Sequence, residues 1–156
     1  MAVNIQTIGV IGAGQMGNGI AHVCALAGYN VVLNDLSADR IKAGLATING
    51  NLTRQASKQG LSDEDRKSAL SRIKGSEKYE GLANCDLVIE TATEKEEVKR
   101  KIFADLCASL KSDAIIATNT SSISITRLAS STDRPEHFIG IHFMNPVPRM
   151  ELVEVI

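Results

Sequence analysis

The feature that most constrains this chain is a glycine-rich turn between an apolar run and a helical pattern. The run Thr7-Ile8-Gly9-Val10-Ile11 leads into Gly12-Ala13-Gly14-Gln15-Met16-Gly17, so glycines recur as G-x-G-x-x-G. The first glycine permits a tight turn, the second lets the backbone approach a pyrophosphate, and the third lets a helix pack closely on a strand. The helix then directs free N–H groups at the phosphates. We therefore predict a dinucleotide site at Gly12, Gly14, Gln15, Met16 and Gly17.

Segments typical of strands and helices alternate along the rest of the chain. Apolar runs predict strands over residues 6–11, 29–34, 73–76, 87–90, 114–118, 137–143 and 152–156. Helical spacing and capping residues predict helices over 16–27, 37–59, 62–73 and 124–129, and a further helix whose core face carries Val98, Ile102, Leu106 and Leu110. This alternation indicates an α/β fold of Rossmann type: a doubly wound, mostly parallel sheet with helices on both faces and a helical excursion after the second strand.

Composition excludes several classes of function. A chain of 156 residues fits one domain, 1–156, with a sizeable core. The net charge of -1 and the aromatic content of 3% give no reason to expect nucleic acid or a membrane surface as a partner. No apolar run could span a bilayer, and no secretory signal opens the sequence. Three cysteines without metal-ligand spacing indicate reduced thiols, no metal site and a cytoplasmic location.

Asp35 is the expected partner of the cofactor's ribose. It follows Gly17 by 18 residues and stands at the end of the second predicted strand, where such an acid is found in dinucleotide-binding folds. Its charge would repel a 2′-phosphate, which predicts NAD rather than NADP. Arg40 keeps the alternative open, because a nearby arginine can accommodate that phosphate.

Polar residues also follow two of the apolar strands. The fourth predicted strand ends in Glu90-Thr91-Ala92-Thr93-Glu94, and the fifth ends in Asn119-Thr120-Ser121-Ser122. Ligands in open α/β sheets bind at the carboxyl ends of strands. Although any one of these residues could be a turn or cap residue, their coincidence at two strand ends favours a site.

A third polar group surrounds the last two predicted strands. His142 closes an apolar strand, and Asn145 precedes a stiff Pro146-Val147-Pro148 loop. Glu154 interrupts an apolar run, which is costly for an unpaired carboxylate. If the two strands pair antiparallel, His142 and Glu154 lie opposite each other as a His–Glu dyad, with the carboxylate fixing the imidazole tautomer. We interpret the other histidines, His22 and His137, as structural.

Four segments together resemble the L-3-hydroxyacyl-CoA dehydrogenases, especially the short-chain bacterial 3-hydroxybutyryl-CoA dehydrogenases. They are the glycine turn, Asn119-Thr120-Ser121-Ser122, His142-Phe143-Met144-Asn145-Pro146-Val147-Pro148 and Glu151-Leu152-Val153-Glu154-Val155-Ile156. The second and third are much more specific than the glycine turn. The resemblance covers the whole chain.

The resemblance implies an activity and roles for particular residues. The enzyme would oxidise a short-chain L-3-hydroxyacyl-CoA to the 3-oxoacyl-CoA with NAD, and run the reverse, in fatty acid metabolism. His142 would be the general acid/base, Glu154 would orient it, and Ser121 would bind the substrate 3-oxygen and help to place the nicotinamide. Asn145 would line the same pocket.

The resemblance implies further contacts outside the catalytic group. Asn119, Glu94 and Lys99 would belong to the cofactor side, and Asn51 and Lys58 would contact coenzyme A on a substrate such as acetoacetyl-CoA. Asn51 stands where the family often has serine, which puts that contact in doubt.

The resemblance also implies a helical C-terminal domain that supplies an active-site asparagine and a homodimer or larger homo-oligomer. We expect that domain to be absent here, since the sequence ends at Ile156 within an apolar run, and the fragment to bind NAD while being catalytically incomplete. Two alternatives remain: another β-hydroxyacid or sugar-acid dehydrogenase, which usually relies on a lysine base, and a non-catalytic NAD-binding module.

Overall fold

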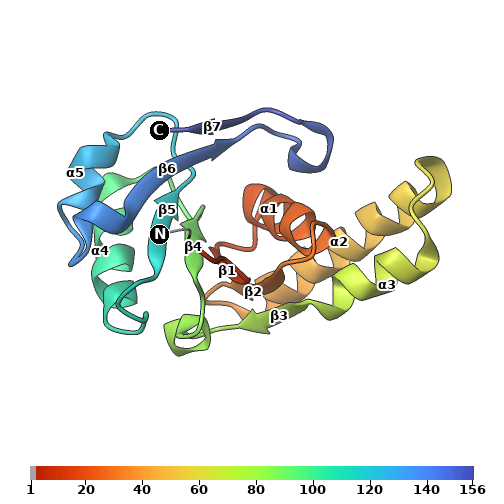
Figure 1. The fold of residues 1–156 in the computed structure, drawn as a ribbon, viewed down its shortest axis with the longest axis horizontal. Coiled ribbons are helices and arrows are strands. Elements are labelled where there is room, and N and C mark those ends of the chain that lie inside the picture. Colours follow the sequence, from red (N-terminus) through yellow and green to blue (C-terminus); the bar gives the residue numbers. More distant parts are fainter. Residues whose placement is uncertain (1–2) are drawn as a thin grey trace.

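A computed structural model describes residues 3–156 and contains a twisted sheet of seven strands (Figure 1). The strands are β1 (Thr7–Ile11), β2 (Asn30–Asn34), β3 (Ile73–Ser76), β4 (Leu87–Glu90), β5 (Ile115–Thr118), β6 (Phe138–Phe143) and β7 (Val153–Val155). Their order is β3-β2-β1-β4-β5-β6-β7. All neighbouring pairs from β3 to β6 are parallel, and β7 is antiparallel to β6. The strand order reverses between β1 and β4, the place where such sheets bind ligands.

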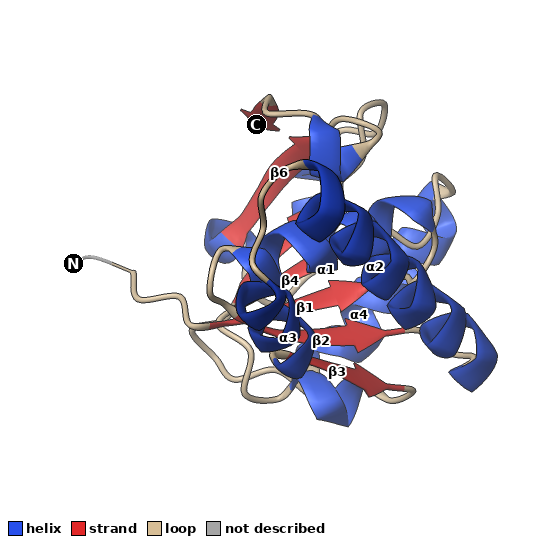
Figure 2. Ribbon diagram, turned by 90° about the vertical axis from the view of Figure 1, so that its right-hand side faces the viewer, coloured by secondary structure: helices blue, strands red, loops and turns tan. Residues whose placement is uncertain are grey.

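Helices cover both faces of this sheet (Figure 2). They are α1 (Gln15–Leu26), α2 (Ala38–Lys58), α3 (Asp63–Ser71), α4 (Glu96–Cys107) and α5 (Ile125–Ala129). The first three lie on one side, where α2 and α3 extend beyond the sheet as a helical arm, and α4 and α5 lie on the other (Figure 1). The Rossmann-type fold expected from the sequence is therefore confirmed, including the helical excursion after β2.

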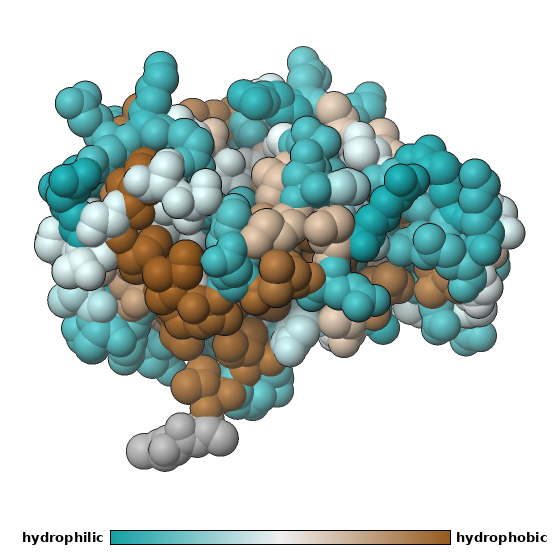
Figure 3. Space-filling view, turned by 90° about the horizontal axis from the view of Figure 1, so that it is seen from above, coloured by the Kyte–Doolittle hydropathy of each residue, from teal (hydrophilic) through white to brown (hydrophobic). Residues whose placement is uncertain are grey.

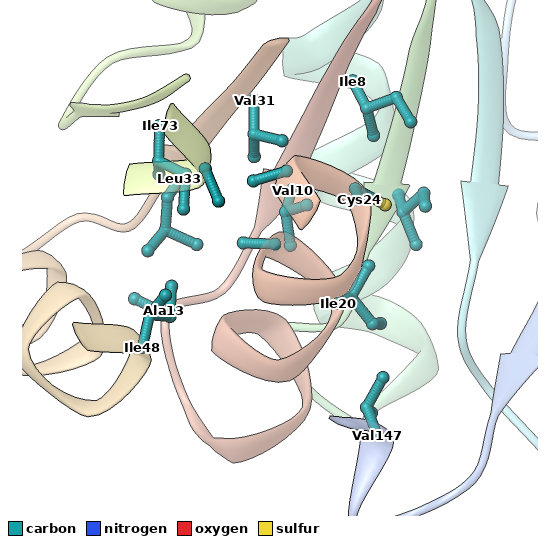
Figure 4. Packing of buried hydrophobic residues seen from close by; sticks show 14 of the residues in the cluster. Ile8, Val10, Ala13, Ile20, Cys24, Val31, Leu33, Ile48, Ile73 and Val147 are labelled. Atoms are coloured by element: carbon teal, nitrogen blue, oxygen red, sulfur yellow. The ribbon is translucent and has the colours of Figure 1, made fainter. Parts of the chain in front are cut away.

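The core consists of two apolar layers, one on each side of the sheet. Side chains alternate along β1 and β4, so Ile8, Val10 and Ile89 belong to the layer under α1 and α2, whereas Ile11 and Val88 belong to the layer under α4. Figure 4 shows the first layer, in which Ile20 of α1 and Ile48 of α2 approach the strands. The burial of β4 on both faces explains its continuous apolar sequence.

The predicted boundaries agree with the structure to within one or two residues for most elements. Ser37, Ser62 and Ser124 cap helices through their hydroxyl groups, which fixes where α2, α3 and α5 begin. Three short 3-10 turns were not expected from the sequence: Tyr79–Leu82, Pro135–His137 and Val147–Arg149.

The predicted core face of α4 was partly wrong. Leu106 and Leu110 are buried and Ile102 packs against the core, but Val98 is 42% exposed, and Lys99 and Phe103 are buried in addition. The expected face is therefore correct at Ile102, Leu106 and Leu110 and wrong at Val98.

Cys24 and Cys85 are buried, Cys107 is partly buried, and all three thiols are free, as expected from their number and spacing. Burial raises the pKa of Cys24 and of Cys85 to about 11. No helix among residues 3–156 has the length and apolar character needed to cross a membrane.

Apolar side chains reach the surface mainly along the β6–β7 end of the molecule. Figure 3 shows a contiguous hydrophobic area on this upper face, while the helical arm is mostly hydrophilic. The exposed side chains near β7 are Met150, Leu152, Val153, Val155 and Ile156.

Candidate active site

The glycine turn joins β1 to α1 in a shape that only glycine permits. Gly12 has a φ of 101°, in the left-handed region. A Cβ on Gly17 would lie 1.6 Å from the Gly12 carbonyl oxygen, whereas a Cβ on Gly14 would project into open space. Gly14 precedes α1 without a side-chain cap, and no acidic residue occupies the first turn. The N–H groups around Gln15 and Met16 therefore remain available to an anion, which fits a pyrophosphate.

A cavity of about 460 Å³ lies on the β4 side of this turn. Asp35 lines it, and its Oδ2 accepts a hydrogen bond of 3.0 Å from the Ala13 N–H. Arg40 also lines the cavity, with its Nε 3.7 Å from Asp35 Oδ2. The Ala13 and Ser37 N–H groups, together with Arg40, hold the Asp35 carboxylate in the lining of the cavity.

Glu94 connects the loops that follow β4 and β5. Its Oε2 accepts hydrogen bonds from the hydroxyl groups of Thr120, at 2.8 Å, and Ser122, at 3.1 Å. Ser121 lies between these two residues and is exposed. The two polar loops that the sequence placed at strand ends are therefore tied together around Ser121.

Asn119 joins the end of β5 to the end of β6. Its side-chain oxygen accepts a hydrogen bond of 2.8 Å from the Phe143 N–H. Phe143 directly follows His142, so Asn119 couples the Ser121 loop to the strand that carries the histidine.

His142 and Glu154 lie opposite each other across the antiparallel β6–β7 pair. The distance from His142 Nδ1 to Glu154 Oε1 is 3.1 Å. A carboxylate can only accept, so Nδ1 carries a proton, and in the neutral imidazole Nε2 then has a free lone pair. The predicted pairing is thus present, and His142 is partly exposed, with 22% of its side chain accessible.

The loop from Asn145 to Pro148 packs against the cofactor helix. Val147 is buried, and a Cβ on Gly19 would lie 2.9 Å from Val147 Cβ, so the small residue lets the loop approach α1 (Figure 4). Asn145 lines a second cavity together with Gly14 and Gln15. Asn145 therefore lies near the end of the glycine turn, where α1 begins.

Asn51 and Lys58 lie farther out on α2. Both line a groove between this helix and the proline loop. Sequence reasoning missed two more cations in the groove, Arg54 and Arg149. Arg54 falls between Asn51 and Lys58 at spacings of three and four residues, a signal that could have identified it. The Arg54 guanidinium also donates to the Asn51 side-chain oxygen.

Lys99 does not reach the cofactor side expected of it. It is 1% exposed, and its ammonium lies 2.5 Å from Glu90 Oε1 inside the protein. The structure therefore does not support direct contact between Lys99 and a ligand.

The two remaining histidines lie apart from the polar strand ends. The His22 ring nitrogen Nε2 binds Gln55 Oε1 at 2.8 Å between α1 and α2, and burial lowers its pKa. His137 belongs to the 3-10 turn before β6, away from the Glu154 pairing. Within residues 3–156 there is no cluster of side chains that could hold a metal ion.

This fold, its glycine turn and its polar strand ends define the dinucleotide-binding domain of a dehydrogenase. Residues 7–156 match the family model for the NAD binding domain of 3-hydroxyacyl-CoA dehydrogenase. The chain belongs to this family, as the resemblance in the sequence suggested, and its cofactor is NAD.

Several relatives are similar over all or nearly all of the chain. A 3-hydroxybutyryl-CoA dehydrogenase of Bradyrhizobium diazoefficiens is 72% identical over 156 residues, which are all of this chain and 53% of the relative. A 3-hydroxyadipyl-CoA dehydrogenase of Escherichia coli is 42% identical over 156 residues, which cover 33% of it. The crystal structure of an (S)-3-hydroxybutyryl-CoA dehydrogenase from Ralstonia eutropha is 50% identical with a TM-score of 0.95, over 97% of this chain and 54% of that one. The chain thus spans about half the length of these relatives, or less.

Proposed function

We propose that the protein to which this chain belongs oxidises short-chain L-3-hydroxyacyl-CoA thioesters to 3-oxoacyl-CoA with NAD, and also catalyses the reverse reaction. The observation that carries this proposal is the His142–Glu154 pair at the carboxyl edge of the sheet, with 3.1 Å between Nδ1 and Oε1. A dinucleotide-binding module without catalysis would have no need of a histidine held in a single tautomer at this edge.

Each residue of the proposed active site has one role in the reaction. His142 Nε2 accepts the proton of the substrate 3-hydroxyl, and Glu154 stabilises the imidazolium that results. Bound NAD supplies the hydride acceptor. Ser121 donates a hydrogen bond to the 3-oxygen. Asn145 lines the second cavity, beside Gly14 and Gln15. In the reverse direction the imidazolium returns its proton to the developing alkoxide.

The groove on α2 supports coenzyme A as the carrier of the acyl group. Arg54, Lys58 and Arg149 provide three cations, and the residues that line the groove include no acid. Phosphate groups are favoured by such a cluster. The names of the relatives include both hydroxybutyryl and hydroxyadipyl thioesters. We therefore propose a short acyl chain and do not specify the group at its far end.

We further propose that the complete protein has a helical C-terminal domain and forms a homodimer or larger homo-oligomer in the cytoplasm. The greater length of the relatives and the exposed apolar side chains along β7 support a covering domain there. The fragment alone would then bind NAD and turn over acetoacetyl-CoA poorly.

The proposal is tested by the His142→Gln variant of the complete protein. We expect turnover of acetoacetyl-CoA with NADH to fall roughly 10²- to 10⁴-fold, as for the loss of a general acid/base, while NADH affinity is retained. His137→Gln serves as the control, because His137 lies outside the polar strand ends. Near-normal turnover in His142→Gln would remove the histidine from this role.

A further inference from the structure

Three buried polar side chains lie behind the loop that follows β4. Glu90, Lys99 and Thr118 are at most 1% exposed. Lys99 Nζ lies 2.5 Å from Glu90 Oε1, and the Thr118 hydroxyl donates to the same oxygen at 2.8 Å. The other carboxylate oxygen, Oε2, accepts the backbone N–H of Ala92 at 2.8 Å. One carboxylate therefore joins β4, α4, β5 and the loop.

The loop and α4 together form one wall of the Asp35 cavity. Its lining includes Thr91, Ala92 and Thr93 of the loop and Val98, Lys101 and Ile102 of α4. Lys99 lies within this same turn of α4 but points inward to Glu90. The pair thus attaches the wall of the cavity to the end of β4.

The loop has little room to move toward the glycine turn. The Thr91 N–H donates to the Ile11 carbonyl at 2.8 Å, and the Thr91 hydroxyl donates to the same oxygen at 2.9 Å. A Cβ on Gly12 would lie only 3.1 Å from Ala92 Cα. A loop that shifted inward would therefore close on the turn, and one that shifted outward would widen the cavity.

Stability alone does not account for these three residues. A buried ion pair costs desolvation, and well-packed apolar side chains of similar volume are often equally stable. An apolar side chain at position 90, however, could not accept the Ala92 N–H. What the carboxylate adds is the position of the loop.

We propose that Glu90, supported by Lys99 and Thr118, is a positioning residue for NAD: it holds the Ala92 loop and the α4 wall at the spacing that the cofactor needs without touching the cofactor. The hydrogen bond to Ala92 is the contact through which it acts.

The test compares NADH binding by two uncharged double variants of the 156-residue chain. Glu90→Met with Lys99→Met removes the acceptor for Ala92, whereas Glu90→Gln with Lys99→Met keeps an amide oxygen in its place. We expect NADH dissociation constants about tenfold higher for the first and less than about threefold higher for the second, the scale of one hydrogen bond. Lys111→Met, which removes the partner of Asp86 at the other end of β4, should leave NADH binding unchanged. Equal affinities in the two double variants would overturn the proposal.

Amide hydrogen exchange at Ala92 tests the positioning without cofactor. Exchange should be faster in the Glu90→Met double variant than in the parent and close to the parent in the Glu90→Gln variant; unchanged exchange in both contradicts the proposal. A parent chain that fails to bind NADH would contradict the cofactor assignment, while this exchange measurement still reports on the loop.

Thr118 provides a milder pair of variants should the Glu90→Met double variant not fold. Thr118→Val removes one hydroxyl that donates to Glu90, and Thr118→Ser retains it. We expect about threefold weaker NADH binding for the valine variant and parental binding for the serine variant. Equal binding by the two would count against the role of Glu90.

Discussion

At each end of β4 a carboxylate pairs with a lysine and accepts hydrogen bonds from the backbone. At the amino end, Asp86 binds the Lys111 ammonium, and its Oδ2 accepts the N–H groups of Gln6 and Thr7 at 2.8 and 3.0 Å. At the carboxyl end, Glu90 binds Lys99 and accepts the Ala92 N–H. Each end of β4 thus has a carboxylate–lysine ion pair that also binds backbone N–H groups.

The two ends differ in burial and in what they hold. The side chains of Asp86 and Lys111 are 18% and 39% exposed, whereas those of Glu90 and Lys99 are 0% and 1% exposed. Asp86 fixes the start of β1, far from any predicted ligand contact, while Glu90 fixes a loop that lines the Asp35 cavity. We therefore expect the pair at the amino end of β4 to serve stability and the pair at its carboxyl end to serve binding as well.

Replacing one lysine at a time should give the largest difference in stability between the two ends. Lys99→Met leaves the Glu90 charge buried and unpaired, and we expect the free energy of unfolding to fall by about 3–5 kcal/mol. Lys111→Met leaves Asp86 in contact with water and with two backbone N–H groups, so its loss should be much smaller. Urea denaturation of both variants measures the difference. Similar losses in the two would show that burial does not distinguish the ends.

A change at Asp35 should affect binding far more than stability. Asp35→Asn removes the charge that is expected to face the ribose, and we expect NADH to bind about tenfold more weakly, with a smaller preference over NADPH, as for the loss of a charge-assisted hydrogen bond. Asp39→Asn, an exposed aspartate in the first turn of α2, is the control. Titration of NADH and NADPH by fluorescence gives both constants. A parent chain that binds the two cofactors equally would contradict the assigned role.

The smallest expected effect is the acid dependence of the amino end. The Lys111 ammonium, with the Gln6 and Thr7 N–H groups, lowers the pKa of Asp86 from 3.8 to about 2. A carboxyl group whose pKa is lower in the folded state stabilises the fold above its unfolded pKa and loses that contribution as the pH falls through the folded value. Between about pH 4 and about pH 2 the parent should therefore lose stability more steeply than Asp86→Asn. Parallel pH profiles in chemical denaturation would show that the carboxylate contributes nothing there.

Local sequence signals were sufficient to predict most of the framework. Apolar runs identified the strands because a strand buried on both faces must be apolar along its length. Ser37 and Ser62 identified helix starts because their hydroxyls satisfy N–H groups that the helix leaves free. The opposition of His142 and Glu154 followed from one assumption, an antiparallel pair, which the structure contains.

Interactions between segments that are distant in the chain could not be predicted from the sequence. Lys99 lies with Phe103 and Leu106 on the buried face of α4, at spacings of four and seven residues. Nothing in the local sequence, however, indicates that Lys99 pairs with Glu90. Arg149 approaches the α2 groove only because the proline loop folds back onto α1. The turn at Tyr79–Leu82 is too short to show a period.

The β6–β7 hairpin also limits how this sequence can change in length. Gly140 and Ile156 exchange two backbone hydrogen bonds of 2.9 Å. These bonds fix the register of the two strands, so that His142 lies opposite Glu154 two residues further along. A slip of one residue would bring Val153 or Val155 opposite the histidine and turn the carboxylate to the other face. Insertions should therefore be tolerated in the connection between α2 and α3, where only exposed helix ends would move, but not within the two paired strands.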